Sequence, residues 1–236
     1  MSVNWGGGDY GGMEHHPYWH MSSGSMYRES LHAHEAAHGW YGNGVRLSCW
    51  EDFVLSEGTA TYLAARGLAH AGVDVWPEYE CELRYICDPM YKANTIALPD
   101  QTCNQIDILN APLWSSAPYY KGAFFFREVA NTIGAAALDQ KLADFYAAHV
   151  GQATRMQELL DFIKQGVDAQ LQTTIDGTRR HLAPRPRLPN RPEQHLPVVR
   201  PIEPLESCLG GIVAGRAAAV FDASCAQRGG VGEQDQ

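Results

Sequence analysis

The sequence lacks the features that define several large classes of protein. No apolar run approaches the roughly 18 residues of a membrane-spanning helix, so no transmembrane segment is predicted. The first residues lack the charged and apolar regions of a signal peptide. Acidic side chains outnumber basic ones and the net charge is -9. That balance argues against nucleic acid as a partner and against binding to an anionic membrane surface.

Cysteine usage excludes one kind of metal site and leaves two other roles open. The six cysteines include no C-x-x-C pair, which argues against a structural zinc site. Their even number suits disulfides and an oxidising compartment, as for a secreted or periplasmic parent protein. Buried free thiols are the alternative. Among pairings we favour Cys103 with Cys81 or Cys87, because these positions flank one predicted helix and the loop after it.

Hydrophobic periodicity predicts a mainly helical protein with a small strand component. We expect residues 1–27 to form loops with an edge strand near their start, and residues 92–118 to be irregular because prolines interrupt them. Apolar stripes at helical spacing indicate core-facing helices between residues 124 and 149. Other helices are predicted over residues 28–42, 50–69 and 76–91, and a last one, opened by a capping box of Thr154 and Gln157, ends at Gly166.

The composition changes near residue 170. Residues 178–204 contain seven prolines and six arginines, with little apolar periodicity. Such a segment has too few apolar side chains to form a core. We therefore expect one domain over residues 1–169 and a poorly ordered linker and tail over residues 170–236.

The most informative pattern is His34-Glu35-Ala36-Ala37-His38, followed after 18 residues by Glu57. Histidines four apart lie on one face of a helix, so both can reach one metal ion. Two histidines and one glutamate are an established ligand set for catalytic zinc. Glu35 would then reach a water molecule on the metal and act as general base. The alternative is an amphipathic helix that carries two surface histidines.

Three further segments, in the same order along the chain, make the sequence similar to a known family. Gly11-Gly12-Met13-Glu14 precedes the histidines, and Trp50 to Tyr62 surrounds Glu57. Tyr119-Tyr120-Lys121-Gly122 follows. Together with the zinc motif they resemble the gluzincin aminopeptidases, the family of alanyl aminopeptidase and leukotriene hydrolase. The resemblance covers roughly residues 8–165.

The resemblance implies a fold, a cofactor and a role for each residue. The fold would be a thermolysin-like metallopeptidase catalytic domain, mainly α with an α+β remnant, and truncated relative to the family. One Zn²⁺ would be bound by His34, His38 and Glu57, with Glu35 as the catalytic base. Tyr119 would stabilise the oxyanion, and Glu14 would bind the free N-terminus of a peptide substrate.

Several other polar residues allow more than one interpretation. Pro17 disfavours a helix through His16 and His20, so we expect these histidines and His15 to line the substrate cleft rather than to bind a second zinc. Either Asp52 or Glu51 would hydrogen-bond a zinc-ligand histidine, or both would be exposed carboxylates at a helix start.

The function predicted from the sequence is hydrolysis of the N-terminal peptide bond of peptides by a zinc-dependent aminopeptidase. One alternative is an inactive remnant that binds zinc or peptides without cleaving them. Another is a gluzincin with endopeptidase or epoxide hydrolase chemistry. The sequence does not specify the side-chain preference or the oligomeric state.

Overall fold

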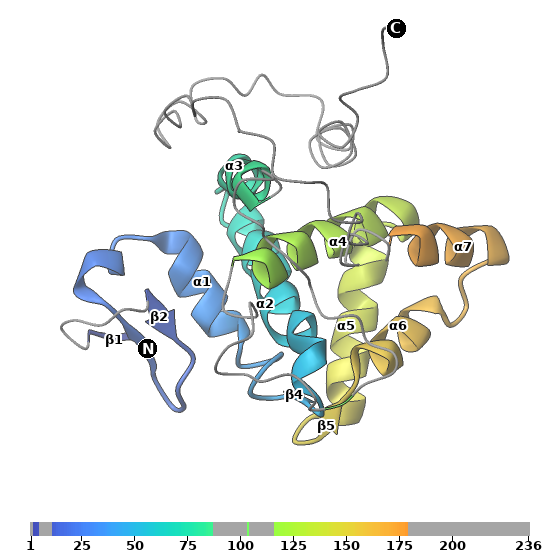
Figure 1. The fold of residues 1–236 in the computed structure, drawn as a ribbon, viewed down its shortest axis with the longest axis horizontal. Helices are drawn as coiled ribbons and strands as arrows, with labels where there is room; N and C mark the ends of the chain where they lie inside the picture. The colour runs from blue at the N-terminus through green and yellow to red at the C-terminus, as the bar shows by residue number, and fades with distance from the viewer. Residues whose placement is uncertain (1, 5–10, 87–102, 104–115, 179–236) are drawn as a thin grey trace, which may run out of the picture.

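The computed structural model describes residues 2–4, 11–86, 103 and 116–178 (Figure 1). Of these residues 66% are helical, which confirms the mainly α fold. The helices are α1 (Glu29–Ala37), α2 (Phe53–His70), α3 (Trp76–Ile86), α4 (Ala117–Ile133), α5 (Ala135–His149), α6 (Met156–Lys164) and α7 (Ala169–Thr178), with short 3-10 turns at Ser23–Ser25 and Trp50–Asp52. No helix in this part of the chain is long and apolar enough to cross a membrane.

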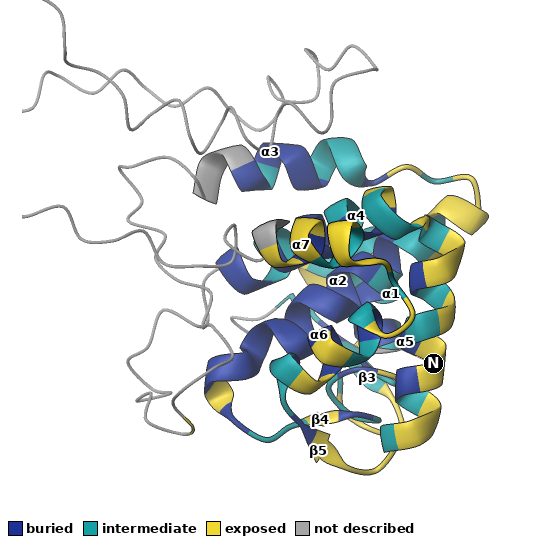
Figure 2. Ribbon diagram, turned by 90° about the vertical axis from the view of Figure 1, so that its right-hand side faces the viewer, coloured by how far each residue is buried: buried dark blue, intermediate teal, exposed yellow. Residues whose placement is uncertain are grey.

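Helix α2 forms the centre of the molecule. It packs against α1 on one side and most extensively against α4 on another. Helices α5 and α7 pack against α4, and α6 packs against α5 (Figure 1). The predicted apolar stripes in α4 and α5 are buried, with Phe125 and Leu138 fully excluded from solvent. Helix α2 is buried from Phe53 to Ala65 apart from the partly buried Leu63 and is exposed at its C-terminal end, whereas α5 and α7 expose one face (Figure 2). The site-bearing helices thus lie in the interior and the later helices support them.

Two glycines allow α2 and α4 to approach closely. A Cβ atom built on Gly122 would lie 2.5 Å from the Cα atom of Gly58, so any larger residue would push the two backbones apart. Helices separated by ordinary side chains lie about 8–10 Å apart. The glycine pair thus brings Tyr119 of α4 toward the part of α2 that carries Glu57.

Two small sheets accompany the helices, one formed by the N-terminal segment and one that joins two interhelical segments. Strands β1 (Ser2–Asn4), β2 (Gly12–Met13) and β3 (Trp19–Met21) form a sheet in the order β1-β3-β2, parallel and then antiparallel. Strands β4 (Arg46–Leu47) and β5 (Ala153–Thr154) pair in parallel and tie the segment after α1 to the segment after α5. The strand component is therefore larger than the single edge strand predicted near the N-terminus.

The structure corrects the predicted end of the folded domain. Helix α7 begins at Ala169 and so occupies the start of the linker that was expected over residues 170–236, and its Ile175 is buried. Ile175 gives α7 an apolar contact with the core, which the proline-rich sequence after it does not reveal. Residues 179–236 lie outside the described residues, so their expected disorder stays a prediction. Most of the irregular segment expected over residues 92–118 also lies outside them.

Two local predictions about the chain are wrong. Cys103 is disulfide-bonded to Cys49, 54 residues away, rather than to Cys81 or Cys87. Cys81 is also disulfide-bonded. The N-cap of α6 is Arg155 rather than Thr154, whose buried hydroxyl has no hydrogen-bond partner within the described part. Pairing between β4 and β5 extends through Thr154 and so moves the helix start one residue later.

Candidate metal centre

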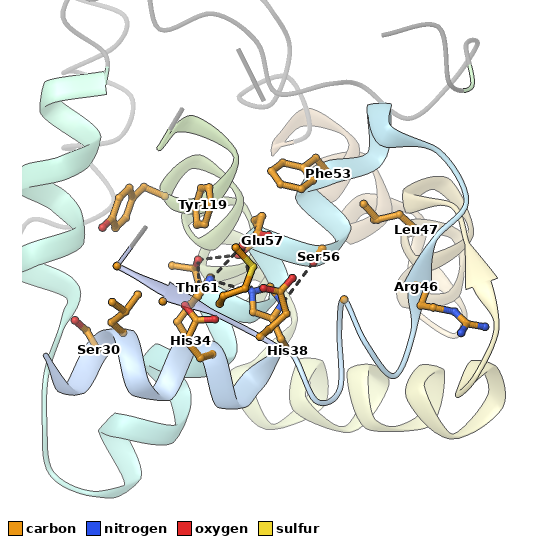
Figure 3. A pocket seen from close by; sticks show the side chains of 18 of the residues that line it. Ser30, His34, His38, Arg46, Leu47, Phe53, Ser56, Glu57, Thr61 and Tyr119 are labelled. Atoms are coloured by element: carbon orange, nitrogen blue, oxygen red, sulfur yellow. Dashed lines mark hydrogen bonds and ion pairs between the residues drawn. The ribbon is translucent and has the colours of Figure 1, made fainter. Parts of the chain in front are cut away.

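Three side chains from two helices converge on one point. Nε2 of His34 lies 3.0 Å from Nε2 of His38, and Oε2 of Glu57 lies 3.2 Å from the former and 3.3 Å from the latter. Helix α1 supplies the histidines, one turn apart, and α2 supplies the carboxylate (Figure 3). All three residues are buried. The structure thus brings together the three ligands predicted from the sequence.

The hydrogen bonds behind the two imidazoles define which nitrogens face this point. Nδ1 of His38 donates to the carbonyl oxygen of Tyr41 at 3.0 Å. The Thr61 hydroxyl donates to the Glu57 carbonyl oxygen at 2.7 Å and can therefore accept from Nδ1 of His34 at 3.2 Å. With both Nδ1 atoms protonated, both Nε2 atoms present lone pairs. Two lone pairs and a carboxylate oxygen at these distances repel one another unless a cation lies between them.

The geometry fits zinc. Ligands about 2.0–2.1 Å from a tetrahedral zinc lie about 3.3–3.4 Å from one another. The observed separations of 3.0, 3.2 and 3.3 Å approach the edges of that tetrahedron. The donor types are also suitable, because imidazole nitrogen and carboxylate oxygen both bind zinc. Three ligands leave the fourth position for water or substrate.

The electrostatics of the cluster favour a positive charge at the same point. Burial lowers the pKa of His38, but the Glu57 carboxylate outweighs it and raises that pKa to about 9. Burial raises the pKa of Glu57, but the charge on His38 and hydrogen bonds from both histidines lower it to about 2. Both shifts have the same cause, which is that the cluster favours a positive charge between these side chains. A divalent cation would supply that charge.

Strand β2 covers Glu35 and explains its unusual environment. A Cβ atom on Gly12 would lie 2.3 Å from Oε1 of Glu35, so only glycine lets the strand approach this carboxylate. Glu35 is buried, and burial is the main cause that raises its pKa to about 8. Burial thus strengthens the proton affinity of the Glu35 carboxylate, a property that a general base uses.

Glu14 enters the same site from the end of β2. Its carboxylate oxygen lies within 4.8 Å of ligand atoms on Glu35 and His38. Its backbone is held by Asn43, whose Nδ2 donates to the Glu14 carbonyl oxygen at 2.6 Å. Glu14 is only partly buried, so its carboxylate is accessible from the cavity. The carboxylate of Glu14 thus lies beside the His34–His38–Glu57 cluster, although Glu14 is 20 residues before His34 in sequence.

Tyr119 lies on the opposite wall, on the first turn of α4. Its ring centroid is 5.5 Å from that of His34 and 6.4 Å from that of Phe53 (Figure 3). Burial raises the pKa of its hydroxyl, which therefore stays protonated and able to donate. Tyr120 instead packs against Tyr79, with centroids 5.2 Å apart. The two neighbouring tyrosines thus pack against different helices, Tyr119 near His34 of α1 and Tyr120 against Tyr79 of α3.

The residues that hold the histidines differ from those predicted. Asp52 does not contact either histidine but forms an ion pair with Arg155, with Oδ2 2.5 Å from Nε. Both Asp52 and Glu51 are buried, so the exposed alternative is also wrong. The partners are Thr61 and the Tyr41 carbonyl oxygen, as described above, with the Ser56 hydroxyl 3.4 Å from Nδ1 of His38. Position 61 had a detectable signal, since it follows Glu57 by four residues and shares its helix face.

The cavity around the cluster has a volume of about 650 Å³. Its lining includes Glu14, His34, Glu35, Glu57 and Tyr119. The three early histidines at positions 15, 16 and 20 are not part of this lining, so that prediction is wrong. His15 and His20 instead contact each other, with their Nδ1 atoms 3.0 Å apart.

The two-histidine, one-glutamate donor set beside a buried carboxylate matches a ligand set that is known from catalytic zinc sites. The profile of the peptidase family M1 domain matches residues 16–177, about two thirds of the chain. The chain belongs to this family, which confirms the resemblance to the gluzincin aminopeptidases.

Individual relatives agree with this assignment. Human aminopeptidase N is 27% identical over 66% of this chain, and leucine aminopeptidase 2 of Aspergillus fumigatus is 29% identical over 68%. The chain spans only 17% and 27% of the length of these two relatives.

Solved structures show the same fold. An M1 zinc metallopeptidase from Deinococcus radiodurans is similar with a TM-score of 0.59 and 24% identity, covering 81% of this chain and 41% of its own. Leukotriene A4 hydrolase from Saccharomyces cerevisiae gives a TM-score of 0.61 and 23% identity, covering 78% and 31%.

Proposed function

We propose that this chain is the catalytic part of a zinc-dependent aminopeptidase. The observation that carries the proposal is that one cavity contains the His34–His38–Glu57 cluster, the buried Glu35 and the partly exposed Glu14. The first three residues would hold the ion. Zinc bound there would polarise a carbonyl group and lower the pKa of a water molecule to about 7.

Glu35 is the proposed general base. It would take a proton from the attacking water and pass it to the nitrogen of the leaving amine as the peptide bond breaks. The strand above it excludes solvent, because Gly12 allows β2 to lie against its carboxylate. A carboxylate without a surrounding water shell accepts a proton more readily.

Tyr119 is the proposed oxyanion donor. Its hydroxyl would donate a hydrogen bond to the carbonyl oxygen of the cleaved residue as negative charge develops there. The ring lies across the cavity from α1, fixed by its packing near His34 and Phe53. One such donor is worth roughly 3–4 kcal/mol of barrier reduction.

Glu14 would make the enzyme an exopeptidase. Its carboxylate lies a few ångströms from the cluster and would pair with a free α-ammonium group. An internal peptide segment offers no such charge. Loss of one partner of a buried charge pair costs roughly 2–5 kcal/mol, enough to impose a preference for free N-termini.

A zinc assay combined with turnover of aminoacyl arylamides tests the proposal. We expect one zinc per chain and hydrolysis of the free aminoacyl substrate but not of its N-acetylated form. Glu57→Ala should remove zinc, whereas Glu14→Gln should retain zinc and lose the discrimination against the acetylated substrate. Stoichiometric zinc with no turnover would favour a non-cleaving binding protein. Hydrolysis of N-blocked peptides at a comparable rate would contradict the exopeptidase assignment.

A further inference from the structure

The cavity lies between α1 and the segment that contains β2, and these two elements define its long axis. A Cβ atom on Gly11 would meet Leu31 at 2.9 Å, Gly12 approaches Glu35, and Asn43 holds the backbone of Glu14. Contacts along β2 therefore follow α1 from its N-terminal end to the segment beyond its C-terminal end. Glu14 lies at the C-terminal side of the metal cluster.

On the proposed function, this direction places the two halves of a substrate. The ammonium group would lie at Glu14, and the scissile carbonyl group would lie at the cluster. The residues after the scissile bond would then extend toward the N-terminal end of α1. Ser30 marks that end of the cavity in Figure 3, well away from Arg46 on the other side.

One cationic side chain lines the cavity at that end. Arg28 is the N-cap residue of α1, and its side chain is 41% exposed. Its Nη2 atom donates to Oε1 of Glu78 on α3 at 3.0 Å, and the Ser30 hydroxyl donates to the same oxygen at 3.4 Å. Arg28 is part of the cavity lining and Glu78 is not. Glu78 thus holds the guanidinium from behind and leaves it facing the cavity.

The walls beside Arg28 are aromatic. Tyr79 and Tyr120 line the cavity there, with ring centroids 5.2 Å apart. An ionic contact between such rings is screened less than one on an open surface. A guanidinium group also offers several donors, of which one carboxylate can accept two.

We propose that Arg28 binds a carboxylate group on the leaving-group side of the substrate. Arg28 and His34 are six residues apart, or about 9 Å along the helix axis. An extended peptide advances about 3.3 Å per residue, so the guanidinium lies one to three residues beyond the scissile bond. That carboxylate is either the C-terminus of a short peptide or the side chain of an acidic residue.

The experiment measures binding, so it does not depend on turnover. Zinc-loaded protein carrying Glu35→Gln is titrated with Ala-Ala-Ala and its C-terminal amide, and with amide-capped Ala-Glu-Ala and Ala-Gln-Ala. We expect about tenfold tighter binding of the charged member in at least one pair. The pair that shows it identifies the source of the carboxylate. Adding Arg28→Met should bring that ratio close to one, and Arg28→Lys should restore part of it.

Two further variants separate substrate binding from a structural role. Arg66→Met removes the Arg66–Asp139 pair, a similar half-exposed bridge between helices outside the cavity, and should leave the ratio unchanged. Glu78→Gln breaks the ion pair but keeps the guanidinium, so it should preserve or increase the ratio. Equal binding within both pairs, or an unchanged ratio with Arg28→Met, would refute the inference. If the wild-type protein turns over substrate but the charged and uncharged peptides bind equally, the aminopeptidase proposal stands and the Arg28 inference fails. If the charged peptides bind more tightly but the wild-type protein shows no turnover, the Arg28 inference stands and the aminopeptidase proposal fails.

Discussion

Helices α2 and α6 differ in the kinds of residue that they bury. The buried face of α6 consists only of Met156, Leu159, Leu160 and Ile163. Helix α2 buries apolar residues too, but Ser56, Glu57, Thr59 and Thr61 are buried among them. Burial of polar groups is unfavourable unless each finds a partner. Polar burial in α2 is therefore evidence for a site, and apolar burial in α6 is evidence for support.

This contrast predicts two kinds of mutational effect. Changes in the polar part of α1, α2 and α4 should alter zinc binding or turnover more than stability. Changes in the apolar face of α6 should alter the free energy of unfolding and leave the chemistry of each folded molecule unchanged. The four substitutions below test the contrast, from the largest expected effect to the smallest.

Glu35→Gln should reduce turnover of an aminoacyl arylamide by about 10³–10⁴-fold, because the general base is lost while the shape is retained. Zinc content, measured by atomic absorption, should stay the same. Glu158→Gln on the exposed face of α6 is the matched control and should have no effect. A Glu35→Gln protein with wild-type turnover would show that the proton takes another route.

Tyr119→Phe should lower kcat by about 10²–10³-fold with little change in zinc content, because only a hydrogen bond to the developing oxyanion is removed. Tyr146→Phe on α5 provides the control for loss of a tyrosine hydroxyl. Steady-state kinetics distinguish the outcomes. A change in KM alone would mean that Tyr119 binds substrate without assisting the chemistry.

Leu160→Ala should lower the free energy of unfolding by about 2–5 kcal/mol, because it leaves a cavity in the fully packed face of α6. Denaturation in urea measures the loss. The kcat of the remaining folded protein should match the wild type. Loss of kcat at full folding would show that α6 contributes to the site, and the division between site and support would fail.

Thr61→Val should weaken zinc binding by about 10–100-fold, because Nδ1 of His34 loses its hydrogen-bond acceptor. Thr59→Val is a close control on the same helix. The Thr59 hydroxyl is buried without a partner among the described residues, so its removal should not weaken zinc binding. Competition with a zinc chelator measures both affinities. Equal losses in the two variants would place the effect in helix packing instead.

The sequence predicted most of the site because its key spacings are local. His34 and His38 are one helical turn apart, so a helix alone brings them together. Apolar periodicity likewise predicted the positions of α2, α4 and α5. The sequence could not predict features that depend on contacts between distant segments, such as the Cys49–Cys103 disulfide and the Asp52–Arg155 ion pair.

The same reason explains the errors at α6 and α7. Thr154 has the composition of an N-cap, but strand pairing with β4 takes precedence over that local preference. Helix α7 has weak periodicity of its own and is stabilised by packing on α4. The position of the Arg28 side chain likewise depends on α3, because Glu78, 50 residues later in the sequence, accepts its hydrogen bond.

The close contact of Gly58 with Gly122 also limits how such a site can be varied. Residues that line the cavity can be exchanged for others of similar size while α2 and α4 keep their spacing. A single methyl group at position 58 or 122 would move the two helices apart and displace Tyr119 from Glu57. A library aimed at new substrate preference should therefore vary the cavity walls freely and keep these two positions as glycine.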